Sequence, residues 1–273
     1  MLRPARVIFI SILLYLICLL GVANAGQTPN FFASPNILGA SLIAPRAIVD
    51  DMRGKRLKVE LSPAYWSTGF DGGSADGYGG SIALKYEFSP RWGVSLLGGY
   101  GSSNEFSSSK RFFGEPNVPA STKYRLDYSS VVAFALTHDF FSKPGGFRLP
   151  ISIGVASGGG KVSGEEKSTG YTVIIDCETP PVLSFFVGLT ASFNIKDLRF
   201  ISSLMVVGSG DNEITWRHSD GRVETKSFDP SFPSIVSGSI NYAPFNLSYN
   251  FQRSANVEDL TIHSLTWRIP LTN

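Results

Sequence analysis

Between Tyr124 and Phe140 the sequence alternates between mostly apolar side chains and polar or small ones. Successive side chains on a β-strand point to opposite faces, so this pattern predicts one strand with an apolar face. Strands of globular proteins are usually about 5–6 residues long, and this one is roughly three times that length. Aromatic ends, an apolar middle and a polar opposite face are typical of a strand that crosses a lipid bilayer. The apolar row consists of Tyr124, Leu126, Tyr128, Ser130, Val132, Phe134, Leu136, His138 and Phe140.

The first residues have the pattern of a secretory signal peptide. Arg3 and Arg6 precede the apolar run Val7–Val22, and Ala23-Asn24-Ala25 then places small residues at the −3 and −1 positions of a cleavage site. The pattern predicts a leader over residues 1–25 that is removed after Ala25. An uncleaved membrane anchor is the alternative hypothesis.

Without this leader the composition excludes several classes of protein. Two of the 24 basic residues and none of the 22 acidic ones lie in the leader, so the remaining chain carries equal numbers of each. This balance gives no support for nucleic-acid binding. One cysteine remains, Cys177, so we expect no internal disulfide. No later apolar stretch reaches 18 residues, which argues against transmembrane helices.

Alternation of this kind recurs along the chain, and helical periodicity is nearly absent after residue 55. The sequence therefore predicts an all-β fold with ten strands. They are expected at Leu57–Trp66, Gly80–Phe88, Trp92–Ser102, Tyr124–Phe140, Phe147–Ala156, Leu183–Ile195, from Leu198 onward, at Ile235–Tyr242, at Phe245–Phe251 and around Leu265–Leu271.

The connections between these strands alternate in length. Short ones are expected at Ser89-Pro90-Arg91, Ser142–Gly146, Lys196-Asp197 and Ala243-Pro244. Long ones are expected at Gly69–Gly79, Asn104–Lys123, Gly159–Val182 and Ser254–Asp259. A further hairpin, Glu213–Phe228 with an Asp-Gly turn, would extend the seventh and eighth strands as a ribbon beyond the membrane. Short periplasmic turns and longer outer loops are what a transmembrane barrel requires.

Together, these features resemble the outer-membrane β-barrel proteins of Gram-negative bacteria over residues 55–271, at the level of the class. The resemblance implies a single antiparallel up-and-down transmembrane barrel of about ten strands, with eight or twelve as alternatives, over residues 55–273. It also implies location in the cell outer membrane, contact with membrane lipid and lipopolysaccharide, and insertion by the barrel assembly machinery. One departure is the end of the chain, because many such barrels end on an aromatic residue and this one ends Leu271-Thr272-Asn273.

The long strand is expected to descend from the outer surface. Tyr124 and Tyr128 would lie at the outer interface, and His138 and Phe140 at the periplasmic one. The opposite faces of the strands would line a lumen crossed by ion pairs, which in ten strands could be a narrow wet passage or hold a plug. Residues 26–54 form an N-terminal segment expected in the lumen, at the periplasmic mouth or as an ordinary leader strand. The predicted inward residues are Lys58, Glu60, Lys85, Glu87, Arg125, Asp127, Arg148, Arg199, Asn246, Asn250, Gln252 and Arg268.

Few residues suggest chemistry. Omptin proteases use acidic and histidine residues at the outer rim of a ten-stranded barrel, and the rim here would carry Asp71, Asp76, Asp211, His218 and Asp220. The spacing does not reproduce the paired acids of that family. His263 and Ser264 suggest a lipid A deacylase dyad, but neighbours on a strand point to opposite faces. The glycine-rich runs at Gly72–Gly80 and Gly158-Gly159-Gly160 do not open helices, so neither is predicted to cradle phosphate. We therefore predict no catalytic, cofactor or metal site.

These observations favour a non-enzymatic outer-membrane barrel. Its role would be a narrow pore, an envelope structure, or surface interaction through the loops Asn104–Lys123 and Gly159–Val182. Two alternatives stay open: an outer-membrane hydrolase, omptin-like or lipid A modifying, with a rim site near His218, and a soluble secreted β-sandwich that binds a ligand. Oligomeric state is not predicted.

Overall fold

The computed structural model describes residues 57–70, 73–108, 121–140, 147–168, 171–209, 212–228, 234–254 and 261–271. The predicted signal peptide and the segment 26–54 lie outside the described residues. The chain is all-β, as predicted. Its strands are β1 (Leu57–Phe70), β2 (Gly73–Ser89), β3 (Trp92–Ser103), β4 (Phe106–Ser108), β5 (Ser121–Asp139), β6 (Pro150–Ser168), β7 (Tyr171–Ile195), β8 (Leu198–Ser209), β9 (Asn212–His218), β10 (Val223–Phe228), β11 (Ser234–Tyr242), β12 (Leu247–Ser254), β13 (Thr261–Trp267) and β14 (Ile269–Pro270).

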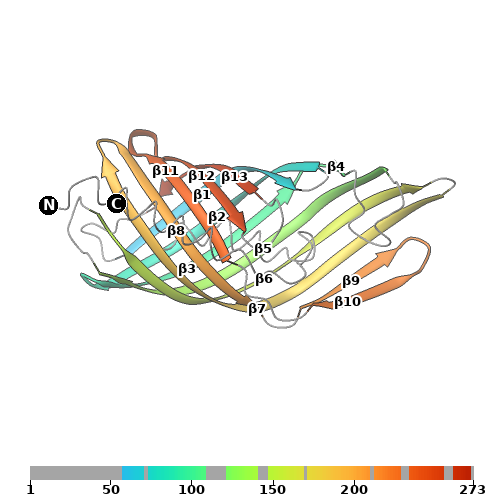
Figure 1. The fold of residues 1–273 in the computed structure, drawn as a ribbon, viewed down its shortest axis with the longest axis horizontal. Helices are drawn as coiled ribbons and strands as arrows, with labels where there is room; N and C mark the ends of the chain where they lie inside the picture. The colour runs from blue at the N-terminus through green and yellow to red at the C-terminus, as the bar shows by residue number, and fades with distance from the viewer. Residues whose placement is uncertain are drawn as a thin grey trace.

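One antiparallel sheet closes on itself to form the barrel (Figure 1). Its wall runs from β7 through β6, β5, β3, β2, β1, β13, β12 and β11 to β8, and β8 pairs back onto β7 over Ser184–Ile195. The short strand β4 continues β3 and pairs with β5, and the short strand β14 continues β13 and pairs with β1. This is the ten-stranded closed barrel of the predicted class. A two-sheet sandwich does not describe it.

Two of the predicted long connections are wrong, because the chain there is paired strand. β2 already begins at Gly73, and β6 and β7 pair along Gly160–Ser168 and Tyr171–Thr179. These strands are rich in glycine and polar residues, so they lack the apolar alternation on which the prediction rests. They still form, because the hydrogen bonds of a β-ladder join backbone groups and need no apolar side chain. The loop Asn104–Lys123 contains β4, and its residues 109–120 lie outside the described part, as do residues 255–260.

The hairpin with the Asp-Gly turn is confirmed as β9 and β10. Gly221 adopts φ 88°, which its lack of a side chain permits. The hairpin also extends two barrel strands, as predicted. β9 continues β8 along β7, where it pairs with Ile175–Glu178, and β10 pairs with β9 in the register in which β11 pairs with β8 (Figure 1).

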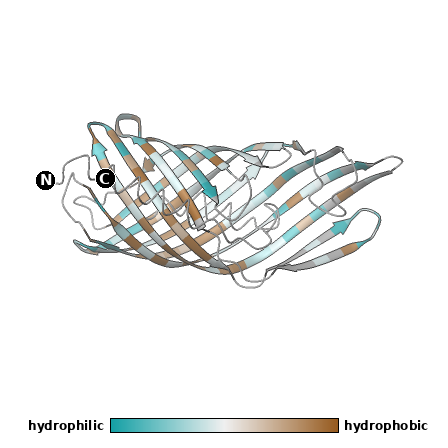
Figure 2. Ribbon diagram, in the orientation of Figure 1, coloured by the Kyte–Doolittle hydropathy of each residue, from teal (hydrophilic) through white to brown (hydrophobic). Residues whose placement is uncertain are grey.

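Many large apolar side chains are exposed on the outside of the barrel, and hydrophobic residues, brown in Figure 2, recur along its strands. Most of these side chains belong to the predicted outward rows, and exposed apolar surface of this extent is typical of a membrane-facing or protein-binding surface. Aromatic groups lie at its edge, where the His138 ring packs 4.4 Å from Trp92 and 5.0 Å from Phe140 between centroids. Exposed members include Leu61, Tyr65, Ile82, Leu84, Tyr86, Leu96, Tyr100, Val132, Phe134, Ile153, Phe185, Val187, Val206, Ile240, Tyr249, Leu265 and Trp267.

The long strand β5 changes face part of the way along its length. Below the change, Val132 and Phe134 are 57% and 46% exposed, as an outward row should be. Above it, Tyr124 and Leu126 are 1% and 4% exposed, so they lie inside. A β-bulge between Leu126 and Tyr128 inserts one residue against β6 and reverses the alternation.

The bulge corrects part of the prediction for β5. Tyr124 was expected at the outer interface but is buried inside, and Arg125 was expected in the lumen but its side chain is 61% exposed on the outer face. Asp127 lies at the bulge, where its Oδ1 accepts hydrogen bonds from Arg125 Nε at 2.8 Å and Ser163 Oγ at 2.9 Å. The closed barrel is unaffected, because a local register shift leaves both ladders intact.

A second bulge lies on β7, at Pro180-Pro181. The pairing of β6 with β7 shifts there from Gly158–Val182 to Gly160–Thr179. Proline cannot donate to a ladder, which explains why the irregularity falls at these two residues. Gly159 fits only without a side chain, because a Cβ would lie 2.7 Å from the Thr179 carbonyl oxygen. Cys177 and Thr179 are buried above this bulge, whereas the residues exposed there include Ile174 and Glu178.

The interior at mid-height contains a cluster of apolar side chains. It extends over seven strands and is formed by Ala83, Leu97, Val131, Ala133, Ala135, Ala156, Phe186, Met205, Val207 and Ile235. Phe186 lies over Gly154, where a Cβ would meet its ring at 2.4 Å and the Phe134 carbonyl oxygen at 2.3 Å.

Within the part of the chain that the structure describes, no helix combines the length and apolarity needed to cross a membrane.

Gly154→Val should destabilise the barrel by about 1–3 kcal/mol, because the added side chain cannot avoid both the Phe186 ring and the β5 backbone. The measurement is urea unfolding of the protein in lipid vesicles. Gly98→Val is the matched control, since a Cβ there meets only Ile82 Cγ2 at an ordinary 3.5 Å. Equal stability of the two variants would contradict the packing described here.

Candidate functional site

Charged side chains gather inside one end of the barrel, the end that carries the short turns 89–92, 195–198 and 242–247. We call it the short-turn end. Its inward charged side chains lie within a few residues of these turns or of the end of a described segment, where water can still reach a charged group. They are Lys58, Glu60, Lys85, Glu87, Asp139, Arg148, Arg199 and Arg268.

Glu60 is the centre of one charge network. Arg268 donates to both of its carboxylate oxygens, from Nε at 3.0 Å and from Nη2 at 2.7 Å. Lys58 Nζ lies 3.3 Å from the same carboxylate, and Ser62 donates to it at 3.0 Å. The network joins β1 to the last residues of the chain, so it fastens the two ends of the barrel sequence together.

Asp139 is the centre of a second network, across β5 and β6. It receives the guanidinium of Arg148, which is held by paired backbone hydrogen bonds with Ser192 of β7. Thr137 and Ser152 share a hydrogen bond of 2.8 Å beside it. Both networks join neighbouring segments of the barrel wall at this end, and a lumen crossed by ion pairs stays a prediction. Of the predicted inward residues, Arg125 lies outside and Asn246 is exposed in the turn after the 3-10 helix Ala243–Phe245.

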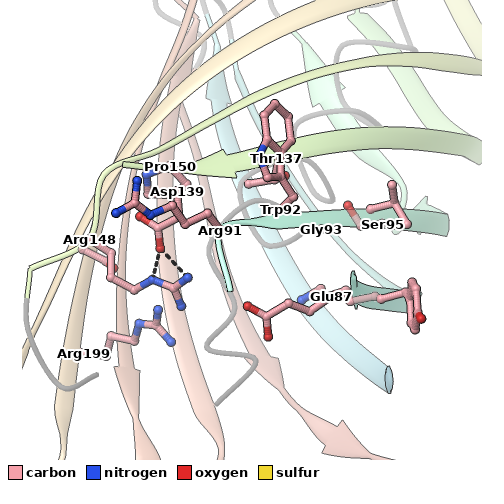
Figure 3. Close-up of a pocket in the computed structure, with 14 residues that line it drawn as sticks. Glu87, Arg91, Trp92, Gly93, Ser95, Thr137, Asp139, Arg148, Pro150 and Arg199 are labelled. Atoms are coloured by element: carbon pink, nitrogen blue, oxygen red, sulfur yellow. Dashed lines mark hydrogen bonds and ion pairs between the residues drawn. The ribbon is translucent and has the colours of Figure 1, made fainter. Parts of the chain in front are cut away.

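Between these groups the lumen opens into a recess with an empty volume of about 550 Å³, part of it open to solvent. Figure 3 shows Arg148 and Arg199 reaching toward the same space, with the Glu87 carboxylate facing them from β2. Four of the residues that line the recess, Lys85, Glu87, Arg148 and Arg199, are among the predicted inward residues, whereas Arg91, Ser95 and Asp139 are not. Arg91 sits in a turn, and the small Ser95 carries no signal except its inward register. The charged side chains lining the recess are Lys85, Glu87, Arg91, Asp139, Arg148 and Arg199.

Most of the side chains that line the recess are charged or carry a hydroxyl group. Its lining presents positive charges, hydroxyl groups and two carboxylates, one of which is paired with Arg148. Neither histidine, cysteine nor a hydroxyl paired with a base lines it. Among the described residues, His, Cys, Asp and Glu gather nowhere in a group of three that could hold a metal ion.

Of the rim residues weighed for proteolysis, Asp220 and His218 interact through their charges, whereas Asp76 lies on β2. Asp220 closes the turn of the ribbon, where it accepts hydrogen bonds from the Arg222 backbone at 3.0 Å and from Arg222 Nε at 2.7 Å. These bonds lower the pKa of Asp220, so it is a poor base. Asp76 instead accepts a hydrogen bond from Asn104 at 2.6 Å. Asp71 and Asp211 lie outside the described residues.

The other chemical candidates are also separated. His263 Nδ1 bonds to the Tyr249 hydroxyl at 2.7 Å on the outer face, whereas Ser264 contacts Asn250 inside, as the alternation of the strand predicts. Cys177 is buried above the second bulge, and burial raises the pKa of its thiol to about 12. The thiol is therefore protonated and unreactive at neutral pH.

Glu60→Gln should lower the free energy of unfolding by about 3 kcal/mol, because it leaves Lys58 and Arg268 without their shared carboxylate in a largely buried setting. The measurement is urea unfolding in vesicles. Glu105→Gln is the matched control, since its ion pair with Lys123 is exposed and its loss should not move the unfolding midpoint. Adding Arg268→Gln to Glu60→Gln should restore part of the loss. Equal effects of the two single variants would contradict a structural role for the Glu60 network.

No family model matches the chain, and no curated protein matches its sequence. Solved structures with a similar fold include the outer membrane protease OmpT from Escherichia coli, at 12% identity and TM-score 0.48, covering 78% of this chain and 93% of that one. The translocator domain of the autotransporter NalP from Neisseria meningitidis gives 11% identity and TM-score 0.48, covering 90% and 98%. A major outer membrane protein from Thermus thermophilus gives 14% and 0.38, covering 78% and 99%. TM-scores below 0.5 carry no conclusion about function.

Proposed function

We propose that this protein is an integral barrel of the outer membrane with a non-enzymatic role, and that it presents a projecting sheet as a binding surface outside the cell. The single observation that carries the proposal is the unequal length of the strands. β5, β6 and β7 have 19, 19 and 25 residues, whereas β12 and β13 have 8 and 7. An apolar band of ~25 Å requires only about ten residues of tilted strand.

The outer face of the long strands changes character at the two bulges. Below them the exposed residues are apolar, such as Val132 on β5 and Phe185 on β7. Above them the outer face carries exposed ion pairs, Lys123 with Glu105 and Lys161 with Asp176, each at 2.8 Å. The hydrogen bond in the first pair raises the pKa of Lys123 and lowers that of Glu105. Such a surface is suited to water and to a partner.

The projecting sheet consists of the outer parts of β5, β6 and β7, with β4 on one side and the β9–β10 ribbon on the other (Figure 1). The predicted interaction surface consists of the loops Asn104–Lys123 and Gly159–Val182. We place the interaction on this sheet instead. A narrow pore is less favoured, because the interior contains a packed cluster of buried apolar side chains around Phe186. A hydrolase is less favoured, because Asp220, which interacts with His218 through its charge, is held by hydrogen bonds from Arg222 that lower its pKa.

Surface labelling of intact cells tests the membrane placement. A membrane-impermeant amine reagent should modify Lys123 and Lys167, whose side chains are about half exposed on the projecting sheet. Lys58 and Lys85, inside the short-turn end, should react only after the outer membrane is opened, with mass spectrometry as the readout. Labelling of Lys85 on intact cells, or extraction of the protein without detergent, would contradict the proposal.

The non-enzymatic role is tested on the purified, folded protein. Planar bilayers should show no discrete conductance, and peptide and lipid A substrates should stay uncleaved. Hydrolysis that is lost in His218→Ala would establish the enzyme alternative instead, and a steady conductance would establish the pore.

A further inference from the structure

We propose that the recess at the short-turn end is a binding site for a small oxyanion, a carboxylate- or phosphate-bearing solute that approaches from that side of the barrel. The recess is built from β2, β3, β5, β7 and β8 and from the chain just before β6, so it lies across the lumen rather than between two neighbouring strands. It is separate from the projecting sheet, and its binding can be measured whether or not the sheet has a partner.

The charge of the lining selects an anion. Four basic side chains, Lys85, Arg91, Arg148 and Arg199, line the recess with two acidic ones, Glu87 and Asp139. Even when each acid is paired, the lining keeps a net positive charge. In a confined space with low-dielectric walls, such a charge attracts an anion more strongly than it would on an open surface.

The two inner arginines give the site its geometry. Arg148 is placed by its backbone pairing with Ser192 and by Asp139, and Arg199 follows directly after the short turn into β8. In Figure 3 both guanidinium groups reach into the recess from the same side. Planar guanidinium groups match the oxygens of carboxylate and phosphate, so two of them on one wall form a clamp for an oxyanion.

Ser95 supplies independent support. Its side chain lines the recess and the residue is 4% exposed, yet Oγ has no hydrogen-bond partner among the described residues. Figure 3 shows Ser95 on the side of the recess across from the two arginines. A buried hydroxyl without a partner is costly, and an oxyanion held by the arginines would accept its proton. The hydroxyl therefore completes a site that has cationic donors on one wall and a neutral donor on the other.

Calorimetric titration of the folded protein in detergent tests the site, with inorganic phosphate and succinate as the probes. We expect saturable binding of at least one of them. Arg199→Gln should weaken it about tenfold or more, and Ser95→Ala should weaken it severalfold. Competition between the two probes would show a general oxyanion site, whereas binding of one alone would identify phosphate or carboxylate as the recognised group.

The matched control is Arg253→Gln, which removes the same charge from the outer face of β12, away from the recess. Its affinity should equal that of the unmodified protein. The heat-dependent shift on gels confirms that each variant is folded, and Arg91→Gln in the exposed turn replaces Arg199→Gln if that variant does not fold. Absence of binding by both probes, or equal weakening by Arg253→Gln, would overturn the proposal.

Discussion

A strand that passes from a membrane into water must move its apolar side chains from the outer face of the barrel to the inner face. The rest of this structure depends on how β5 and β7 meet that requirement. In lipid the apolar side chains point outward, and in water they must point inward. Because side chains alternate strictly along a strand, the exchange needs an odd number of extra residues. The bulges at Leu126–Tyr128 and Pro180-Pro181 supply it.

The two bulges allow the three paired strands β5, β6 and β7 to serve two environments. Below them, small inward side chains and the Phe186 cluster lie inside the barrel, while Val132 and its neighbours are exposed on the outside, where the proposed membrane would lie. Above them, Tyr124 and Cys177 become interior residues and charges take the outer face. The same backbone ladders run through both regions, so the projecting sheet needs no separate fold. Its height follows from strand length alone.

The opposite end of the barrel meets a different constraint, because charges inside a lumen need water or partners. Placing them within a few residues of the short turns provides both. Glu60 and Asp139 each bind an arginine, and basic side chains outnumber acidic ones around the recess. The two ends of the barrel therefore differ, with the proposed binding surface at one end and the proposed oxyanion site at the other.

Much of this architecture is predictable from alternation. The outward row of Leu57–Tyr65, the outward row of Leu183–Ile195 apart from the buried Ala191, and three of the predicted short turns are in place, because each depends only on local sequence period. The fourth predicted turn, Ser142–Gly146, lies outside the described residues. The bulge at Leu126–Tyr128 is not predictable in this way, since the apolar alternation continues through it without a break. The second bulge is different, because the pair Pro180-Pro181 is a sequence signal from which it could be predicted. The recess is not predictable from the sequence either, because Arg91 and Ser95 come together with Arg199 only when the barrel closes.

The most direct test of this account is a spin-label scan along β5 of the protein in lipid vesicles, with Cys177→Ser as the background. Labels at Val132 and Phe134 should be accessible to oxygen and protected from a water-soluble nickel complex. Labels at Lys123 and Arg125 should show the reverse, and the phase of the alternation should invert between Leu126 and Ser129. An alternation that keeps one phase along the whole strand, or nickel access at Val132 and Phe134, would contradict the account.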